Sequence, residues 1–507
     1  MSKLQTKLAS FFRGEGFMGS SITALLIGVV IAVNVIVYAI TTAFGLYLYV
    51  PDSYDMSISG ATDALFADLD ESDRVKVIFC RDKSSLESGA VDEVSAFYDT
   101  ANEFSERYPG FVEIECVNLI TKRNQDGELC DLSKYQILLE DGTLYPMYET
   151  SVIFVSDITH KTITDIASAT CTYDMQNSGQ LTTYNGEEVF ASMALWVLND
   201  DHPTAYFTTF HGEVVDVTFA NMLSCAGYNI DTIDLRMEDM VPPDAGMVII
   251  YNPIKDFERA TEGSGVYSEI EKLEAYLESG GSLYVAVDPY VEKLAVLEEF
   301  LADHGIVISE AEGETGTVKN IVRDSDNAVT TDYFTLISEI AEGEFGDAIE
   351  AKLSNYGSTG VLMRECAALE LSGKAQPLLV ASSASETYAG GVKTGSEGGY
   401  CIAATVTEKN DNGTESHVFV VPSIFICAED TLYTEGYANR NFVYSVLDTV
   451  FGREGVPYGC HTTLFYTNGM LENLTMQTAR IYTALLLSIP AIIAIIGAVV
   501  VIRRKNR

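Results

Sequence analysis

Polar side chains follow three apolar runs in the middle of the chain, at the points where each run ends. The first run is followed by His211-Gly212-Glu213, the second ends in Tyr251-Asn252-Pro253, and the third is followed by Asp288. In open α/β sheets, ligands bind at the carboxyl ends of parallel strands. We therefore expect a ligand or a partner at these turns. The candidate residues are His211, Gly212, Glu213, Tyr251, Asn252 and Asp288.

His211 and Glu213 form the sharpest of these groups. An imidazole and a carboxylate two residues apart could bind a metal ion or move a proton. Two ligands do not complete a metal site, and the remaining histidines show no ligand spacing, so we expect no metal. Two other interpretations stay open: a structural turn that caps the following helix, or a contact with a ligand or partner.

Parallel strands and crossover helices must position these residues. The runs Ala205–Phe210, Met247–Tyr251 and Leu283–Val287 are almost continuously apolar or β-prone, as expected for strands covered on both faces. Amphipathic stretches alternate with these runs, which predicts an α/β fold with a doubly wound sheet. One such helix is predicted over 270–277, and Gly280-Gly281 marks its end.

Residues 52–200 are predicted to form a first α/β domain. Its turn Arg81-Asp82-Lys83 has no Cys-x-x-Cys, so a redox role is not expected. The order of its elements is nevertheless compatible with a thioredoxin-like layer. The predicted strands and helices are Arg74–Cys80 (strand), Val91–Tyr108 (helix), Val112–Leu119, Tyr135–Leu139 and Val152–Val155 (strands), and Glu187–Asn199 (helix).

Residues 201–470 are predicted to form a second α/β domain, which holds the candidate site. The polar stretch 311–335 and the Gly/Ser-rich stretch 388–399 predict loops. Asn410-Asp411-Asn412-Gly413 predicts a hairpin turn between strands at Ile402–Thr407 and His417–Pro422.

Two uncharged apolar segments, 22–50 and 481–502, are each long enough to cross a bilayer. The tails that flank them, 1–21 and 503–507, are basic, and basic flanks stay on the cytoplasmic side. The sequence therefore predicts a plasma-membrane protein that contacts the lipid bilayer through two helices. Both termini are expected in the cytoplasm, and residues about 51–480 are expected outside it.

The composition excludes some classes of function. The formal net charge of -42 argues against nucleic-acid binding, because such proteins carry basic patches that meet phosphates. No Gly-x-x-x-x-Gly-Lys-[Ser/Thr] motif occurs, so any ATP hydrolysis must come from a partner. The nine cysteines are scattered without a Cys-x-x-Cys pair, which argues against a full disulfide framework and leaves one or two bridges open.

Several stretches, taken in order, resemble the auxiliary-component family of ABC-type transport systems that is named from bacterial gliding motility. The matching stretches are Thr208–Glu213, Gly227–Asn229, Ile233–Leu235, Tyr251–Asp256, Tyr276–Leu283, Asp288-Pro289 and Asn439–Phe442. Members commonly have Gly where Phe210 stands here. The resemblance implies an exported domain related in fold to class I glutamine amidotransferases. It also implies two partners, a multi-span ABC permease and a cytoplasmic ATPase subunit.

An enzyme of amidotransferase type needs a cysteine nucleophile at a tight turn between a strand and a helix. The corresponding turn here is Tyr251-Asn252-Pro253, which has no Cys, Ser or Thr, and Cys225 lies late in a predicted helix. We therefore expect no catalytic residues and no cofactor. The leading hypothesis is a non-catalytic accessory subunit of an ABC-type transport or envelope complex. The alternatives are an envelope enzyme of amidotransferase ancestry and an extracellular ligand-binding sensor.

Overall fold

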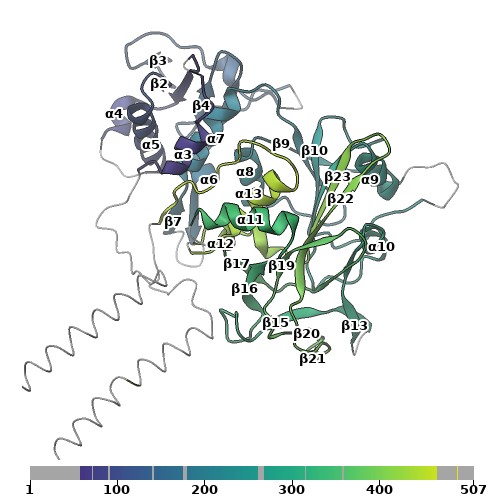
Figure 1. Ribbon diagram of the computed structural model, residues 1–507. Coiled ribbons are helices and arrows are strands. Elements are labelled where there is room, and N and C mark those ends of the chain that lie inside the picture. The colour runs from purple at the N-terminus through teal and green to yellow at the C-terminus, as the bar shows by residue number, and fades with distance from the viewer. Residues whose placement is uncertain are drawn as a thin grey trace, which may run out of the picture. The chain divides into compact units, whose positions relative to one another are not determined.

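A computed structural model describes residues 57–464, apart from short gaps at 71, 89–91, 140–141, 175–179, 261–267, 314–315, 357–358 and 435, and also Ser488 (Figure 1). Both tails and both apolar segments, Ser488 excepted, lie outside these described residues, so the predicted anchors are not tested. Within the described part of the chain, no helix is long and apolar enough to span a membrane. The described residues form an α/β protein, as the sequence predicts.

The first part of the chain forms a five-stranded sheet with one parallel pair of strands and three antiparallel pairs. β1 pairs with β2 in parallel and with β4 antiparallel, and β5 continues from β4. Across the sheet the strands are β3 (Arg123–Asn124), β2 (Val112–Asn118), β1 (Val75–Phe79), β4 (Val152–Val155) and β5 (His160–Ile163). The thioredoxin-like comparison stays a prediction.

Helices α5 (Glu93–Arg107) and α7 (Gly186–Val197) cover one face of this sheet. The aromatic rings of Phe104 on α5 and Phe190 on α7 stack with 4.1 Å between centroids. The side chain of Asp92 caps the first turn of α5 by accepting a hydrogen bond from the backbone N–H of Ser95. The helices predicted at Val91–Tyr108 and Glu187–Asn199 are confirmed as α5 and α7, which the stacked rings and the capped end stabilise.

The opposite face of the same sheet is covered by the segment between β2 and β4. The strand predicted at Tyr135–Leu139 is wrong: η1 (Ser133–Tyr135) is a 3-10 turn, and Leu138 forms only an isolated bridge with Leu144. Tyr135 packs beneath the sheet with Met147. The apolar residues that suggested a strand therefore lie across a face of the sheet and do not extend its edge.

The second sheet holds the candidate site and is parallel along half of its width. From one side to the other, its path is β17 (Val361–Arg364), β16 (Thr335–Ile340), β19 (Gln376–Val380), β22 (Cys401–Lys409), β23 (Glu415–Val421), β11 (Ser282–Ala286), β10 (Ala245–Tyr251), β8 (Thr204–Thr208) and β9 (Asn229–Ile233). The neighbours from β23 to β9 pair in parallel. β12 (Ile306–Ile308) and β18 (Leu369–Leu371) pair with each other beside β22.

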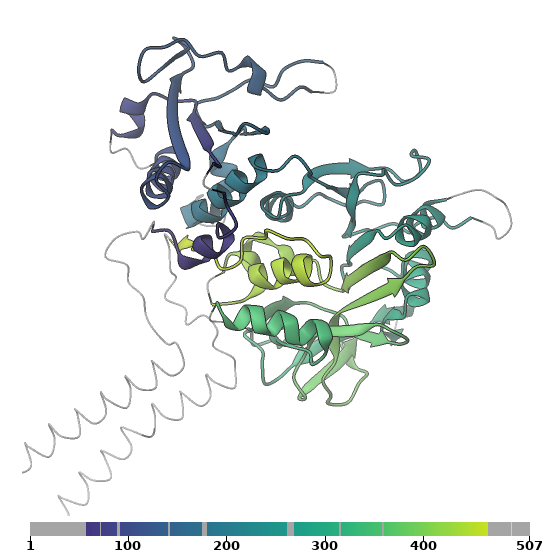
Figure 2. The ribbon, with the colours of Figure 1, turned by 45° about the horizontal axis from the view of Figure 1, so that its top comes forward.

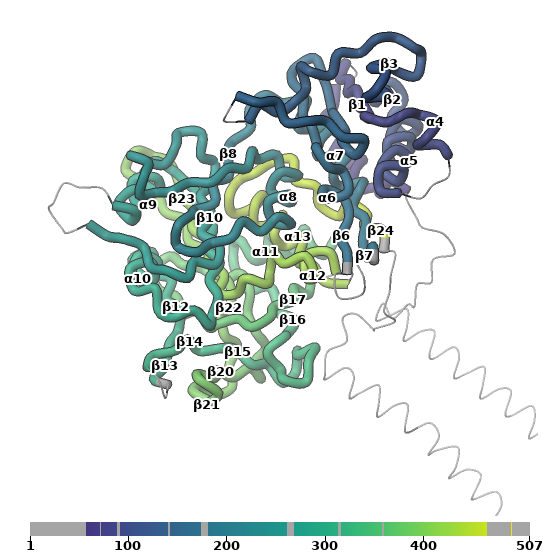
Figure 3. The backbone as a smooth tube through the Cα atoms, turned by 180° about the vertical axis from the view of Figure 1, so that it is seen from behind, coloured from purple at the N-terminus to yellow at the C-terminus, as the bar shows by residue number. Residues whose placement is uncertain are grey.

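Helices cover both faces of the parallel half. Val248 and Ile250 of β10 pack in one core with α9 (Glu269–Glu278) and α10 (Ala295–Asp303), whereas Ile249 packs in the other core. That second core contains α8 (Val217–Cys225), α11 (Glu344–Ser354) and α13 (Asn439–Thr449). Figure 3 shows α9 and α10 on the side away from α8 and α13, and in Figure 2 α11 and α13 run side by side. The continuous apolar runs follow from this double coverage.

Two predicted loops contain strands. Residues 311–335 and 388–399 contribute to short antiparallel pairs of strands. The sequence did not predict these strands, because exposed hairpins and loops have similar polar, Gly-rich compositions. The strands are β13 (Glu310–Gly313), β14 (Gly316–Lys319), β15 (Ile321–Asp324), β20 (Ser385–Ala389) and β21 (Val392–Lys393). The predicted hairpin turn between β22 and β23 is confirmed, with Gly413 at φ +87° and Asn410 N–H bonded to the carbonyl of Thr414.

The last described strand returns to the first part of the chain. β24 (Thr463–Leu464) pairs with β7 (Gln180–Tyr184), which also pairs with β6 (Cys171–Asp174). Short helices α3 (Gly60–Leu65), α4 (Lys83–Leu86), α6 (Ile166–Thr170) and α12 (Glu429–Leu432) and the 3-10 turn η2 (Phe425–Cys427) complete the described elements. The domain boundary between 200 and 201 stays a prediction.

Candidate functional site

The candidate site lies between β8 and β10, where the order in which the chain adds parallel strands to the sheet reverses. From β8 the chain first adds β9 on one side and then β10 on the other, so the loops after β8 and β10 leave neighbouring strands in opposite directions. Such a switch point is where open α/β sheets bind ligands. The two loops are joined directly: the carbonyl of His211 accepts hydrogen bonds from the backbone N–H groups of Ile254 and Lys255, each at 2.8 Å.

The imidazole of His211 is held between two carboxylates. Its Nδ1 lies 3.1 Å from Oε1 of Glu213, and its Nε2 lies 3.0 Å from Oε1 and 3.2 Å from Oε2 of Glu269. The ring also stacks on Phe257 with 3.9 Å between centroids. The residue is only 3% exposed, so both ring nitrogens and one ring face are occupied by protein groups.

Each carboxylate is fixed in turn by its own donors. Glu213 accepts hydrogen bonds from the Thr208 hydroxyl at 2.9 Å and from the backbone N–H of His211 at 2.6 Å. Glu269, the first residue of α9, accepts from the backbone N–H of Glu258 at 2.8 Å. The group is therefore tied to β8, to its loop and to the start of α9.

Sequence reasoning missed Glu269, which lies 58 residues from His211. The available signal was the start of α9. Ser268 and Glu271 form a capping box there, and the pair Ser-x-x-Glu is visible in the sequence. That signal places Glu269 at the positive end of a helix, near the carboxyl edge of the sheet, but it does not name a histidine partner.

The ionisation of this group follows from its geometry. Burial alone lowers the pKa of His211, but the hydrogen bonds to Glu213 and Glu269 outweigh burial and raise the pKa to about 9. For Glu213, burial raises the pKa, and the hydrogen bond to His211 is the largest of the contacts that bring it below its usual value. His211 is therefore an imidazolium ion at neutral pH, and Glu213 is a carboxylate.

An imidazolium held on both nitrogens has no free lone pair. A general base and a metal ligand both need that lone pair, so this arrangement favours a structural ion cluster. Within the described residues, no group of three or more His, Cys, Asp or Glu side chains is placed to hold a metal ion. The predicted helix-capping role of the His211–Glu213 turn is wrong, because Asp216 caps α8 by accepting from the N–H of Phe219 at 2.9 Å.

The turn after β10 has the strained backbone of a strand-to-helix turn that holds a nucleophile in enzymes, but it contains no nucleophile here. Asn252 takes φ +56°, in the left-handed region, and its N–H donates to the carbonyl of Ala286 at 2.8 Å. Among the described residues, its buried Oδ1 has no hydrogen-bond partner. Cys225 is buried at the end of α8, where burial raises its thiol pKa well above the usual range.

Two of the candidate residues do not join the His211 group. Tyr251 faces the opposite core, where its hydroxyl donates to the carbonyl of Ile424. Asp288 accepts a hydrogen bond from the N–H of Tyr290 at 2.8 Å and so stabilises its own turn. Among the described residues, no hydrogen bond or ion pair joins Asp288 to His211. The structure thus brings together His211, Gly212 and Glu213, with Asn252 on the adjacent loop.

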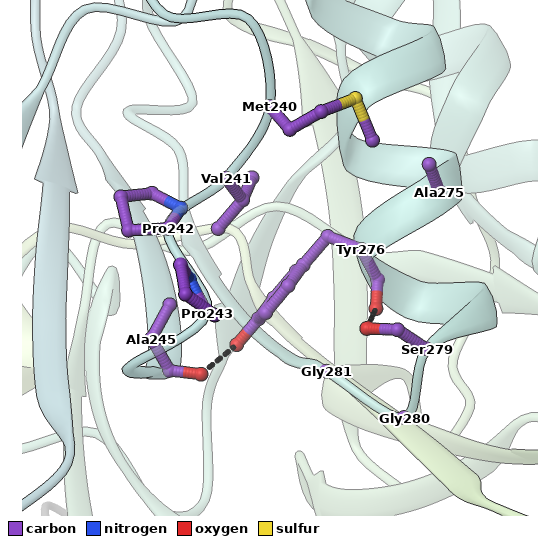
Figure 4. Close-up of a pocket in the computed structure, with 10 residues that line it drawn as sticks. All are labelled: Met240, Val241, Pro242, Pro243, Ala245, Ala275, Tyr276, Ser279, Gly280 and Gly281. Atoms are coloured by element: carbon purple, nitrogen blue, oxygen red, sulfur yellow. Dashed lines mark hydrogen bonds between the residues drawn. The ribbon is translucent and has the colours of Figure 1, made fainter.

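A pocket of about 380 Å³ lies at the other end of these strands, beside the start of β10 and the residues before β11 (Figure 4). The Tyr276 side chain reaches from α9 toward Ala245, and its hydroxyl donates to the carbonyl of Ala245 at 3.3 Å. Its lining is uncharged: Met240, Val241, Pro242, Pro243, Ala245, Ala275, Tyr276, Ser279, Gly280 and Gly281. This pocket contains none of the candidate residues and offers no ionisable group for chemistry at neutral pH.

The stretch Asn439–Phe442 has a structural explanation. Asn439 bonds both backbone groups of Leu362, at 2.8 and 2.9 Å, and its side chain thereby links α13 to β17. Arg440 is paired with Glu188 on α7, with 2.7 Å between Nη1 and Oε2. These residues hold distant segments together and lie away from the switch point.

Comparisons with known proteins find similarities of fold over about half of the chain. The N-terminal domain of mmIFT52 is 16% identical, with a TM-score of 0.36 over 48% of this chain and 96% of that chain. A putative ThuA-like protein from Bacteroides uniformis is 12% identical, with a TM-score of 0.28 over 51% and 95%. PurLQS from Thermotoga maritima is 13% identical, with a TM-score of 0.27 over 49% and 98%. No family model matches the chain, and no curated protein sequence matches it.

Proposed function

We propose that this chain is a non-catalytic accessory subunit of an ABC-type transport or envelope complex, anchored in the plasma membrane by segments 22–50 and 481–502. Its exported part binds a partner or a substrate, while a multi-span permease and a cytoplasmic ATPase supply the channel and the energy. The resemblance to the gliding-motility auxiliary family supports this proposal, and the two long apolar segments with basic flanks support the topology.

One observation carries the non-catalytic part of the proposal. At the edge of the sheet where an amidotransferase-like enzyme needs a nucleophile, the left-handed elbow position holds Asn252. The nearby imidazole of His211 is bound on both nitrogens by Glu213 and Glu269. An amide oxygen is a poor nucleophile and a doubly bound imidazolium cannot take a proton, so the site lacks the two groups that acyl transfer requires.

The partnership is tested by co-expressing the full chain with the permease and the ATPase encoded by neighbouring reading frames, followed by purification in mild detergent. We expect the three proteins in one complex, and recovery of this chain alone at every salt concentration contradicts the proposal. Protease added to intact cells should remove the body of the chain and leave the tails. Cleavage of the tails from outside, with an intact body, would show that the topology is inverted.

The enzyme alternative makes a different prediction at His211 and Glu213. If the chain is an enzyme, the H211Q and E213Q variants lose turnover of an acyl or amide substrate while the complex still forms. Under the proposed function, both variants lower the stability of the exported part, and no amide hydrolysis above the buffer rate is present in the wild type.

A further inference from the structure

Phe210, directly before the His211 cluster, is held in an unfavourable state in two respects. Its backbone takes φ +87°, a left-handed conformation that side chains with a Cβ rarely adopt. Its large apolar ring is 58% exposed. Strained residues that persist in a fold concentrate at functional sites, where the surrounding structure holds them in place. The structure therefore displays this ring at the carboxyl edge of the sheet.

The surroundings of Phe210 are apolar and cationic. The guanidinium of Arg236 lies over the ring, and the ammonium of Lys255 lies 5.8 Å from the ring centroid. The exposed side chain of Ile254 comes from the loop after β10. Ile254 also packs against Gly212, since a Cβ at that glycine would lie 2.2 Å from its Cγ1. Phe210, Arg236, Ile254 and Lys255 form what we call the Phe210 patch.

The two cations of the Phe210 patch differ in their partners. Arg236 is neutralised by Asp234, with hydrogen bonds of 3.0 and 2.7 Å that fix the guanidinium over the ring. Lys255 is exposed, and within the described part of the chain it forms no ion pair. A partner that covers this patch would bury an unpaired cation unless it supplies a carboxylate.

Two other kinds of occupant fit the patch less well. A small polar substrate would need ionisable groups that face it, but the His211 cluster beneath is almost fully buried and already paired. An anionic lipid surface is repelled by a chain with a formal net charge of -42. A polypeptide with apolar side chains around an acidic residue matches both the apolar area and the charge.

We propose that the Phe210 patch docks an apolar segment of an extracytoplasmic protein partner, with Phe210 inserted into that partner and Lys255 paired with one of its carboxylates. This inference rests on the proposed function and assigns the docked segment to the permease. Phe210 is then the anchor of the interface, and its left-handed backbone holds the ring outward before binding.

The F210G variant distinguishes a binding role of the Phe210 ring from a role in stability. Glycine adopts φ +87° without strain, so the full chain in detergent should melt at an unchanged or higher temperature. Affinity for the permease, reconstituted in nanodiscs and measured by biolayer interferometry, should fall at least tenfold. The charge reversal K255E should weaken binding at least fivefold and reduce its dependence on salt. The matched control is V392S, which removes a 60% exposed apolar side chain on β21 and should leave affinity within twofold.

Each remaining outcome is decisive. If F210G binds the permease within twofold of the wild type, the patch is not the interface, although the proposed function stands. If the wild type fails to bind the permease and does not co-purify with the ATPase, the proposed function and this inference both fail. Binding of the wild type, but not of F210G, to phosphatidylglycerol vesicles that contain no permease would assign the patch to lipid and overturn the protein partner.

Discussion

Arg440 on α13 and Glu188 on α7 form a buried ion pair, although they lie 252 residues apart in the sequence. The Glu188 side chain is 0% exposed and the Arg440 side chain 12% exposed. Arg440 also donates to the Thr462 hydroxyl at 2.6 Å, and the Tyr444 hydroxyl donates to Glu188. The pair thus joins α7, which covers the first sheet, to α13, which packs on one face of the second sheet.

The neighbouring Glu187 extends this junction to both ends of the described chain. It accepts hydrogen bonds from the Ser59 backbone N–H at 2.9 Å and from the Thr62 hydroxyl at 2.6 Å. Its other oxygen accepts from the backbone N–H of His461 at 2.7 Å. Helix α7 therefore fixes the segment that follows the first predicted anchor and the segment that precedes the second.

Removing Arg440 should destabilise the exported part strongly. The R440M variant leaves the Glu188 carboxylate buried without its cation, which costs about 3–5 kcal/mol of unfolding free energy. Denaturant titration followed by circular dichroism measures this change. The double variant E188L/R440M should lose less than R440M alone, because it removes the unpaired charge as well.

The control for this experiment is an exposed ion pair. Lys409 and Glu415 lie 3.1 Å apart at the end of a hairpin, with side chains 79% and 46% exposed. Because such pairs contribute about 0–1 kcal/mol, K409M should change the unfolding free energy by less than about 1 kcal/mol. Equal losses for K409M and R440M would contradict the role that we assign to the buried pair.

The His211 cluster makes stability depend on pH in a defined window. The folded-state pKa of His211 is raised to about 9 from an ordinary value of 6.5. A raised pKa gives stability that is complete below pH 6.5 and is lost as the pH rises through 9. The shift corresponds to about 3 kcal/mol. The difference in unfolding free energy between wild type and H211Q should therefore shrink by about that amount between pH 6 and pH 10.

The comparison with H211Q removes the titration of other groups, because lysines, tyrosines and thiols titrate in both proteins. Glu213 acts in the opposite direction: its pKa is lowered, so its contribution is lost only at acid pH, as the pH falls below its unfolded value. Identical slopes for wild type and H211Q between pH 6 and pH 10 would show that His211 is not an imidazolium in the folded protein.

The nine cysteines should all be free thiols. Every one is unpaired in the structure, and six of them are buried. Burial is the largest cause that raises the pKa of Cys401 to about 12 and of Cys171 to about 11, so few thiolates exist at pH 8. Alkylation without reductant, followed by mass spectrometry, should show slow modification of the native chain and nine adducts after denaturation. Fewer adducts, recovered only after reduction, would reveal a disulfide.

The strands around the candidate site could be predicted because their residues are apolar without interruption. Met247–Tyr251 is buried on both faces of the sheet, so its strand could be predicted without an alternation of apolar and polar residues. Gly280-Gly281 follows the end of α9, as the sequence predicts. The strands within 311–335 and 388–399 could not be predicted. Short exposed hairpins such as β20–β21 use the same polar and Gly-rich residues as loops, and their pairing is decided by partners elsewhere in the chain.

The candidate site was predicted in part, because contacts between neighbours in the sequence can be predicted and contacts between distant residues cannot. His211 and Glu213 are close in the sequence, and their local contact follows from their spacing. Glu269 is distant and enters only through the packing of α9 on the sheet. Tyr251 could have been excluded from the site. Side chains alternate along a strand, and Tyr251 shares a face of β10 with Ile249. His211 stacks on Phe257, which lies in the core on the opposite face.

Gly212 should be required both for its backbone and for the space beside it. It takes φ +89°, and an added Cβ would meet Cγ1 of Ile254 at 2.2 Å. Gly413 offers a matched control, with φ +87° and nothing within 4 Å of the added Cβ. We expect G413A to cost about 1–2 kcal/mol for the left-handed backbone alone. G212A should cost about 2–3 kcal/mol, because Ile254 must also move.

The double variant G212A/I254A separates the two causes. Removing the Ile254 side chain relieves the clash and leaves only the backbone term, so the cost of G212A in that background should fall to the value measured for G413A. If G212A costs no more than G413A in the wild-type background, Ile254 does not press on the turn. The contact that joins the His211 loop to the Phe210 patch would then be absent.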